Sequence, residues 1–76
     1  MKELLETIAR ALVDSPDEVN VTQIDKEDGS IVLELRVAGD DMGKVIGKQG
    51  RIAKAIRAVI KSAAIRENKM VSVDIV

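Results

Sequence analysis

Two glycines and several cations gather at one point of the chain, between two segments with helical spacing. The tetrapeptide Gly47-Lys48-Gln49-Gly50 separates a short helical segment from a long one that begins at Arg51. Glycine adopts backbone conformations closed to other residues, and its missing side chain lets a ligand backbone approach the main chain. The first turn of a helix presents free N–H groups and a positive dipole end, which favour phosphate. With Lys48, Arg51 and Lys54 at this end, the pattern predicts a site for an extended phosphodiester strand.

The elements that must hold this loop follow from hydrophobic periodicity. Helical spacing predicts helices at 3–14, 42–46 and 51–65, and alternation predicts strands at 19–24, 31–37 and 71–75. Pro16 ends the first helix, because the residue before a proline disfavours the helical region. Asp28-Gly29 predicts a hairpin between the first two strands, and Ile24 breaks the alternation, where we expect a bulge. The order predicts an α+β fold, a three-stranded sheet with helices packed on one face.

The long helix is predicted to have a core face and a basic face. At 100° per residue, its apolar residues fall within about 100° of arc, opposite the basic ones. The core face comprises Ile52, Ile56, Val59, Ile60 and Ala63, and the basic face comprises Arg51, Lys54, Arg57 and Lys61. Ile65 lies off the core face, so we expect it to be exposed and treat it as a candidate dimer contact. Before the short helix, Asp40 or Asp41 is expected to act as the N-cap.

The size and composition restrict how the chain is stabilised. A 76-residue chain makes one domain, expected over 1–76, and buries only about 60% of the surface that its unfolded form exposes. It contains no Cys and no His, so disulfides are impossible and the usual zinc ligands are missing. Association with another subunit is the remaining route to extra stability. No apolar run reaches the ~18 residues of a membrane span, and the acidic N-terminus does not resemble a signal peptide, so we expect a cytoplasmic protein.

Charge is distributed unevenly along the chain, although the net charge is only −1. Residues 1–41 carry 4 basic and 11 acidic side chains, whereas residues 42–76 carry 8 basic and 2 acidic ones. This asymmetry favours one surface that attracts a polyanion and another that repels it. The alternative is that charge falls unevenly on a solvated surface without a binding role.

Enzymatic and metal chemistry find little support in these residues. Without His or Cys, the common groups for nucleophilic and acid–base catalysis are absent, and we expect no catalytic residues. The segment 43–49 imitates a P-loop but is one residue short and lacks the Ser or Thr that holds magnesium. The acids Asp40-Asp41 and those of 25–28 are better explained by a helix cap and a solvated turn than by a metal site. No cofactor is expected.

The segment Val45-Ile46-Gly47-Lys48-Gln49-Gly50-Arg51 resembles the signature of KH domains. Helix, strand, strand, helix, helix, strand is the order of the type II version, and the chain is most similar to the short bacterial RNA-binding proteins of the KhpA (YlqC) family. The resemblance implies a GxxG loop that clamps the backbone of about four nucleotides of single-stranded RNA. By position, Gly47, Lys48, Gln49 and Gly50 would form the clamp; Lys44, Arg51, Lys54 and Arg57 would hold phosphates; Val45 and Ile52 would contribute to the groove or its floor. Ala53 departs from the family pattern, where a larger aliphatic residue is common, and this affects the shape of the groove.

The resemblance also implies partners and a role. Members of this family are similar in forming homodimers, in pairing with a larger KH-containing protein (KhpB or Jag), and in acting broadly on RNAs as chaperones or post-transcriptional regulators. The chain has no aromatic residue, so base stacking on Phe, Tyr or Trp is excluded. Two alternatives stay open. One is a protein-interaction module that keeps the scaffold with little RNA affinity, and the other is a binder of duplex DNA.

Overall fold

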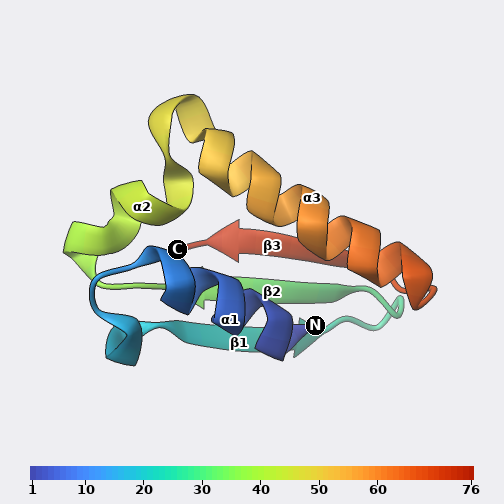
Figure 1. Cartoon of the computed structure of the whole chain (residues 1–76). Coiled ribbons are helices and arrows are strands. Elements are labelled where there is room, and N and C mark those ends of the chain that lie inside the picture. The colour runs from blue at the N-terminus through green and yellow to red at the C-terminus, as the bar shows by residue number, and fades with distance from the viewer.

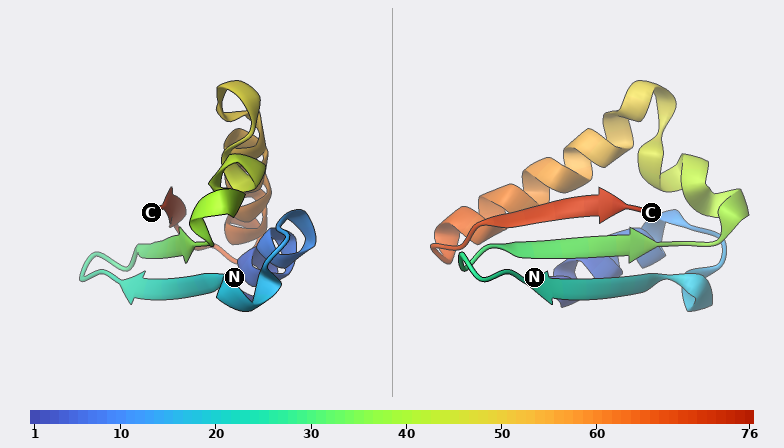
Figure 2. Two further views of the ribbon diagram at one scale, coloured as in Figure 1. Left: turned by 90° about the vertical axis from the view of Figure 1, so that its left-hand side faces the viewer. Right: turned by 180° about the vertical axis from the view of Figure 1, so that it is seen from behind.

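A three-stranded mixed sheet carries three helices on one of its faces (Figures 1 and 2). The computed structural model describes residues 1–76. The strands lie in the order β1-β2-β3, with β1 antiparallel and β3 parallel to the central strand. The elements are α1 (Lys2–Leu12), β1 (Asn20–Asp25), β2 (Ile31–Arg36), α2 (Met42–Ile46), α3 (Arg51–Arg66) and β3 (Val71–Ile75). The expected α+β order is therefore confirmed, and none of the helices combines the length and apolarity that a membrane crossing needs.

Three short 3-10 turns link these elements and were not predicted from the sequence. They span Pro16–Glu18, Gly39–Asp41 and Lys48–Gly50. The first helix ends at Leu12, two residues earlier than expected, because Val13 is already extended with φ −97° and ψ 161°. Pro16 then opens the first 3-10 turn, a position where its missing N–H is not needed.

The hairpin between β1 and β2 is regular, and the bulge predicted at Ile24 is wrong. Pairing runs without interruption from Asn20 opposite Arg36 to Asp25 opposite Ile31. Ile24 breaks the apolar alternation because it faces the side of the sheet away from the helices. There it lies opposite Val32 in the register and is 40% exposed.

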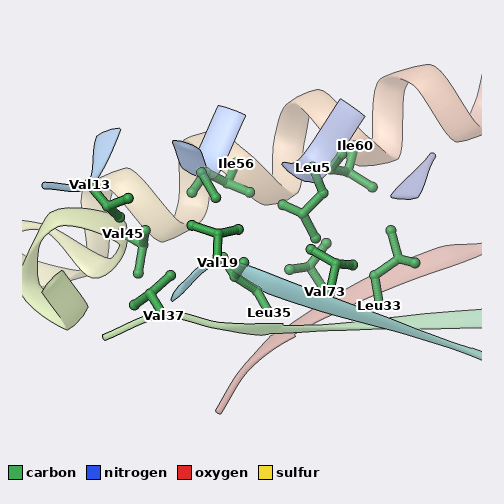
Figure 3. Close-up of a cluster of buried hydrophobic side chains, with 12 residues drawn as sticks. Leu5, Val13, Val19, Leu33, Leu35, Val37, Val45, Ile56, Ile60 and Val73 are labelled. Atoms are coloured by element: carbon green, nitrogen blue, oxygen red, sulfur yellow. The ribbon is translucent and has the colours of Figure 1, made fainter. Parts of the chain in front are cut away.

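The core lies between the sheet and the helices (Figure 3). Leu33 and Leu35 of the central strand are completely buried, as are Leu5 of α1 and Ile60 of α3. Val45 of α2 is equally buried and closes the core at the end nearest the glycine-bounded loop. Because α2 and α3 both contribute to this one cluster, the core fixes where the loop between them is held.

The buried face of α3 is rotated from the one predicted. Ile56 and Ile60 are buried as expected, but Val59 is 48% exposed, so its assignment to the core is wrong. Ala53 and Ala64 are buried instead, at 5% and 1% exposure. Their small side chains let α3 lie close to the sheet on the side towards its basic face, which turns Val59 outwards. Ile65 is 65% exposed, which confirms that it lies outside the core.

Asp41 joins α2 to the end of α1, and the prediction that it or Asp40 caps α2 is wrong. Asp41 occupies the N-cap position but makes no capping hydrogen bond. Its carboxylate, only 2% exposed, instead accepts hydrogen bonds from the backbone N–H groups of Asp14 at 3.2 Å and Ser15 at 3.0 Å. These N–H groups follow the end of α1, where no backbone carbonyl is in reach, so the carboxylate satisfies them.

Candidate nucleic-acid interface

The loop between α2 and α3 projects away from the sheet at one end of the molecule (Figures 1 and 2). Gly47 has φ 73° and ψ 175°, a combination that is essentially restricted to glycine. A Cβ atom on Gly47 would come within 2.5 Å of Cγ1 of Ile52, so this position has no room for a side chain. Gly47 therefore lets the loop fold back closely on the first turn of α3.

Gly50 has a different role in the same loop. Its backbone is left-handed, with φ 73° and ψ 16°, and it forms the N-cap of α3. A Cβ atom on Gly50 would meet nothing within 4 Å. Gln49 beside it is also left-handed, at φ 59°, which is uncommon for a residue with a side chain. Two successive left-handed residues thus turn the chain sharply and leave open space above the start of α3.

Three cations of the loop and the start of α3 have no carboxylate partner. Lys48, Arg51 and Lys54 are exposed and form no ion pair. The Arg51 guanidinium donates to Oε1 of Gln49 over 3.4 Å, a neutral contact that leaves its charge uncompensated. Together with the N-terminus of α3, these groups make the loop a positively charged surface with an accessible backbone.

Lys44 differs from the other expected phosphate ligands. Its Nζ lies 2.8 Å from Oδ2 of Asp14 and 3.8 Å from Oδ1 of Asp41. The hydrogen bond to Asp14, with the charges of the nearby carboxylates, raises the pKa of Lys44 above its ordinary value. Its charge is thus shared with two acids, and it contributes less to the positive surface than the three free cations do.

Val45 and Ile52 were expected in the groove or its floor. Val45 is fully buried in the core beneath α2, so it can support the loop but presents no surface to a ligand. Ile52 is partly buried and packs against the core from the first turn of α3. The structure therefore brings the loop residues 47–50 together with Arg51, while Val45 lies in the core and Ile52 packs beside Gly47.

Arg57 lies within α3, beyond the first turn that follows the loop, and contacts β3. Figure 1 shows α3 running beside β3. Its Nε donates to the backbone carbonyl of Val73 over 3.2 Å. A groove of about 330 Å³ opens here, lined by Arg57, Lys61, Val71, Ser72 and Val73. Sequence reasoning missed this contribution of β3, because nothing in the chain indicates which strand lies at the edge beside α3.

A second groove, mainly apolar, lies between α1 and α3. It has a volume of about 490 Å³ and is lined by Leu4, Ile8, Leu12, Arg51, Ile52, Ala55, Ile56 and Val59. A further hollow of about 520 Å³ continues from Val59 along α3 to Glu67. The exposure of Val59 thus belongs to a continuous apolar strip.

The element order and the glycine-bounded loop between α2 and α3 define a KH domain of type II. The family model for the KhpA/KhpB KH domain matches residues 2–75. Three relatives, each aligned over the full length of both chains, bear the name RNA-binding protein KhpA. They come from Clostridium acetobutylicum at 68% identity, Clostridium perfringens at 63% and Caldanaerobacter subterraneus at 59%. The chain therefore belongs to the KhpA/KhpB KH-domain family, whose relatives here are named as RNA-binding proteins and not as enzymes. No solved structure matches the chain significantly.

Proposed function

We propose that this protein binds single-stranded RNA by clamping its backbone on the loop Gly47–Gly50, and that it acts in the cytoplasm as a general RNA chaperone or post-transcriptional regulator. The observation that carries the proposal is the open space above Gly50, where a side chain would meet nothing within 4 Å. Three unpaired cations, Lys48, Arg51 and Lys54, belong to this loop and to the start of α3. The names of the relatives support RNA as the polyanion.

The clamp recognises the backbone and therefore tolerates many sequences. Phosphates lie against the loop amides, the N-terminus of α3 and the three cations, none of which reads a base edge. If about three phosphates are neutralised, the logarithm of the binding constant falls with the logarithm of salt concentration with a slope of about −2. A single strand fits the loop better than a duplex, because the loop contacts one backbone.

The experiment is fluorescence anisotropy of a labelled single-stranded RNA with the wild type and the double variant Lys48→Asp, Gln49→Asp. Both glycines remain, and Asp tolerates the left-handed conformation of position 49. The matched control is Lys2→Asp, Gln23→Asp, which changes the charge equally on exposed positions of α1 and β1. Circular dichroism verifies the fold, since the chain has no Trp or Tyr for fluorescence.

We expect the wild type and the control to bind, and the loop variant to lose binding while remaining folded. Equal binding by the folded loop variant contradicts the clamp. If neither the wild type nor the control binds RNA at low salt, the protein-interaction alternative takes precedence. Tighter binding to duplex DNA than to single strands would favour the other alternative.

We also propose that two copies of the chain pair through the apolar strip centred on Val59. A two-fold axis at Val59 would set α3 antiparallel to its copy, an isologous arrangement in which each contact occurs twice. Residue 51 of one copy would then oppose residue 67 of the other, at the two ends of the strip. Ala55 and Ala63 would oppose each other, and their small side chains permit close approach of the two helices.

The dimer is tested by sedimentation of Val59→Glu and Ile65→Lys. Val59→Glu places a charge at the centre of the strip, so we expect a monomer, whereas Ile65 lies outside both lined hollows and its substitution should have the smaller effect. An unchanged mass of the Val59 variant contradicts this interface. Pairing with a larger KH-containing protein of the KhpB or Jag kind stays a prediction, checked by whether that protein displaces the second copy.

A further inference from the structure

Arg66, the last residue of α3, belongs to the apolar strip centred on Val59 and carries an uncompensated charge. It lines the same hollow as Val59 and is exposed to solvent. It forms no ion pair, whereas Oε1 of its neighbour Glu67 lies 3.6 Å from Nζ of Lys69. Nothing within one copy of the chain balances the charge of Arg66.

The loop Gly47–Gly50 of the same copy is out of reach of Arg66. The two ends of α3, Arg51 and Arg66, lie 15 positions apart in the helix. At a rise of about 1.5 Å per residue, this separation is about 22 Å along the axis, which exceeds the length of any side chain. Arg66 therefore does not contact a phosphate that lies on its own loop.

The pairing proposed above brings Arg66 to the loop of the other copy. With the two-fold axis at Val59, the residue seven positions after Val59 opposes the residue seven positions before it, so Arg66 opposes Ile52 of the second copy. Arg66 lies within about 20° of Val59 around α3, so both side chains point towards the second copy, whose helix is about 8–10 Å away. Ile52 is the residue that packs against Gly47. Arg66 thus arrives at the base of the loop.

At that point Arg66 meets a second arginine without an acidic partner. Arg51 of the second copy directly precedes Ile52 and forms no ion pair. Two guanidinium groups at one end of the strip repel each other unless an anion lies between them. The carboxylate of Glu67 is nearby but is already paired with Lys69. A phosphate suits the place between the arginines, because a guanidinium binds its oxygens in a planar fork.

We infer that the RNA site is completed across the pair, and that Arg66 of each copy binds a phosphate of the strand held on the loop of the other copy. The inference rests on both parts of the proposed function, the clamp and the pairing through the apolar strip. Each pair then has two equivalent sites, each built from the loop of one copy and Arg66 of the other.

The first test is anisotropy with a labelled RNA of about five nucleotides, which occupies a single loop. An exposed charge pair changes affinity by up to about fivefold, so we expect Arg66→Gln to weaken binding about two- to fivefold. It should also reduce the salt slope by about 0.7. Arg36→Gln is the matched control, because Arg36 of β2 is also exposed and unpaired, and its affinity should be that of the wild type. In the Val59→Glu monomer, Arg66→Gln should leave the affinity unchanged.

The decisive test uses mixed pairs, purified with a different tag on each copy, that carry the same substitutions in two arrangements. In the first, one copy has the loop substitutions Lys48→Asp and Gln49→Asp, and the other has Arg66→Gln. The intact loop then faces a native Arg66, so wild-type affinity per loop is expected. In the second, all three substitutions are on one copy and the other is wild type. The intact loop then faces glutamine, and binding should be about two- to fivefold weaker.

The outcomes separate this inference from the proposals beneath it. Equal affinity of the two mixed pairs overturns the inference while the clamp and the pair stand, as does a loss from Arg66→Gln that persists in the Val59→Glu monomer. A wild type that sediments as a monomer contradicts the pairing and the inference with it. Absence of any RNA binding by the wild type contradicts the clamp. Circular dichroism verifies that every variant is folded.

Discussion

The two glycines of the loop differ in a way that a stability experiment can separate. In Gly47→Ala, the alanine must adopt φ 73° and ψ 175°, which costs about 1–3 kcal/mol. Its Cβ also lies 2.5 Å from Cγ1 and 2.9 Å from Cδ1 of Ile52, and relief of such overpacking costs about 1–3 kcal/mol more. The loss of unfolded-chain entropy returns about 0.4–1 kcal/mol, so a net loss of about 2–5 kcal/mol is expected.

In Gly50→Ala, the loss of stability comes from the backbone conformation alone. The left-handed conformation at φ 73° and ψ 16° costs about 1–2 kcal/mol, and the new Cβ meets nothing within 4 Å. After the same entropy correction, a net loss of about 1 kcal/mol is expected. For a domain of this size, each kcal/mol lowers the melting temperature by about 4–8 °C. Gly50→Ala should therefore melt about 4–8 °C below the wild type, and Gly47→Ala at least about 10 °C below it.

The assay is thermal and urea unfolding followed by circular dichroism. Truncation of Ile52 to alanine in the Gly47→Ala background removes Cγ1 and Cδ1, so a double-mutant cycle should show that part of the Gly47→Ala loss is recovered. The effect on RNA affinity should not follow the effect on stability. The Cβ of Gly50→Ala enters the space where the strand would lie, so this folded variant should bind more weakly. Equal melting temperatures for the two variants, or no coupling between positions 47 and 52, would refute the reasoning.

Other predictions concern the hydrogen bonds of Asp41, the turn of the β1–β2 hairpin and the apolar strip centred on Val59. Asp41→Asn replaces one acceptor oxygen by a donor and leaves a backbone N–H unsatisfied, so urea unfolding should show a loss of about 1–3 kcal/mol, whereas exposed Asp40→Asn should change stability by less than about 0.5 kcal/mol. Hydrogen bonds from Ser30 hold the pKa of Asp28 below its ordinary value of 3.8, so the contribution of Asp28 to stability is present above that pH and is lost as pH falls through the lowered pKa. An NMR titration of Ser30→Ala should show the pKa of Asp28 moving back towards 3.8, and an unmoved value contradicts the assigned cause. Val59→Glu should leave the melting temperature of the monomer nearly unchanged, because the side chain is 48% exposed; a large loss would mean that Val59 packs in the core after all.

The sequence determined the element order and the loop because both depend on local rules. Alternation over β2 and β3 and helical spacing in α2 and α3 agree with the strands and helices observed. The positions of Gly47 and Gly50 between two helices were sufficient to predict a tight turn with an open backbone. Glycine is selected there by backbone conformation, which neighbouring residues largely set.

Tertiary packing decided which face of each element is buried. A helical wheel places Val59 at one edge of the apolar stripe, and α3 packs through the other edge and the adjoining Ala53 and Ala64, because these small residues allow the closest approach to the sheet. Likewise, the apolar Ile24 suggested a bulge, whereas the regular pairing with β2 turns it to the far face. Periodicity gives the width of an apolar stripe, and only the neighbouring elements determine which part of it they cover.

The partners of polar groups also depended on the fold. Asp41 was expected to cap its own helix, but folding brings the N–H groups of Asp14 and Ser15, 27 and 26 residues earlier, within reach of its carboxylate. Arg57 was grouped with phosphate ligands by its place on the basic face, and its bond to Val73 joins residues 16 apart in the chain. Side-chain chemistry and local spacing can be read along the chain, whereas a hydrogen bond between distant residues exists only after the elements have packed.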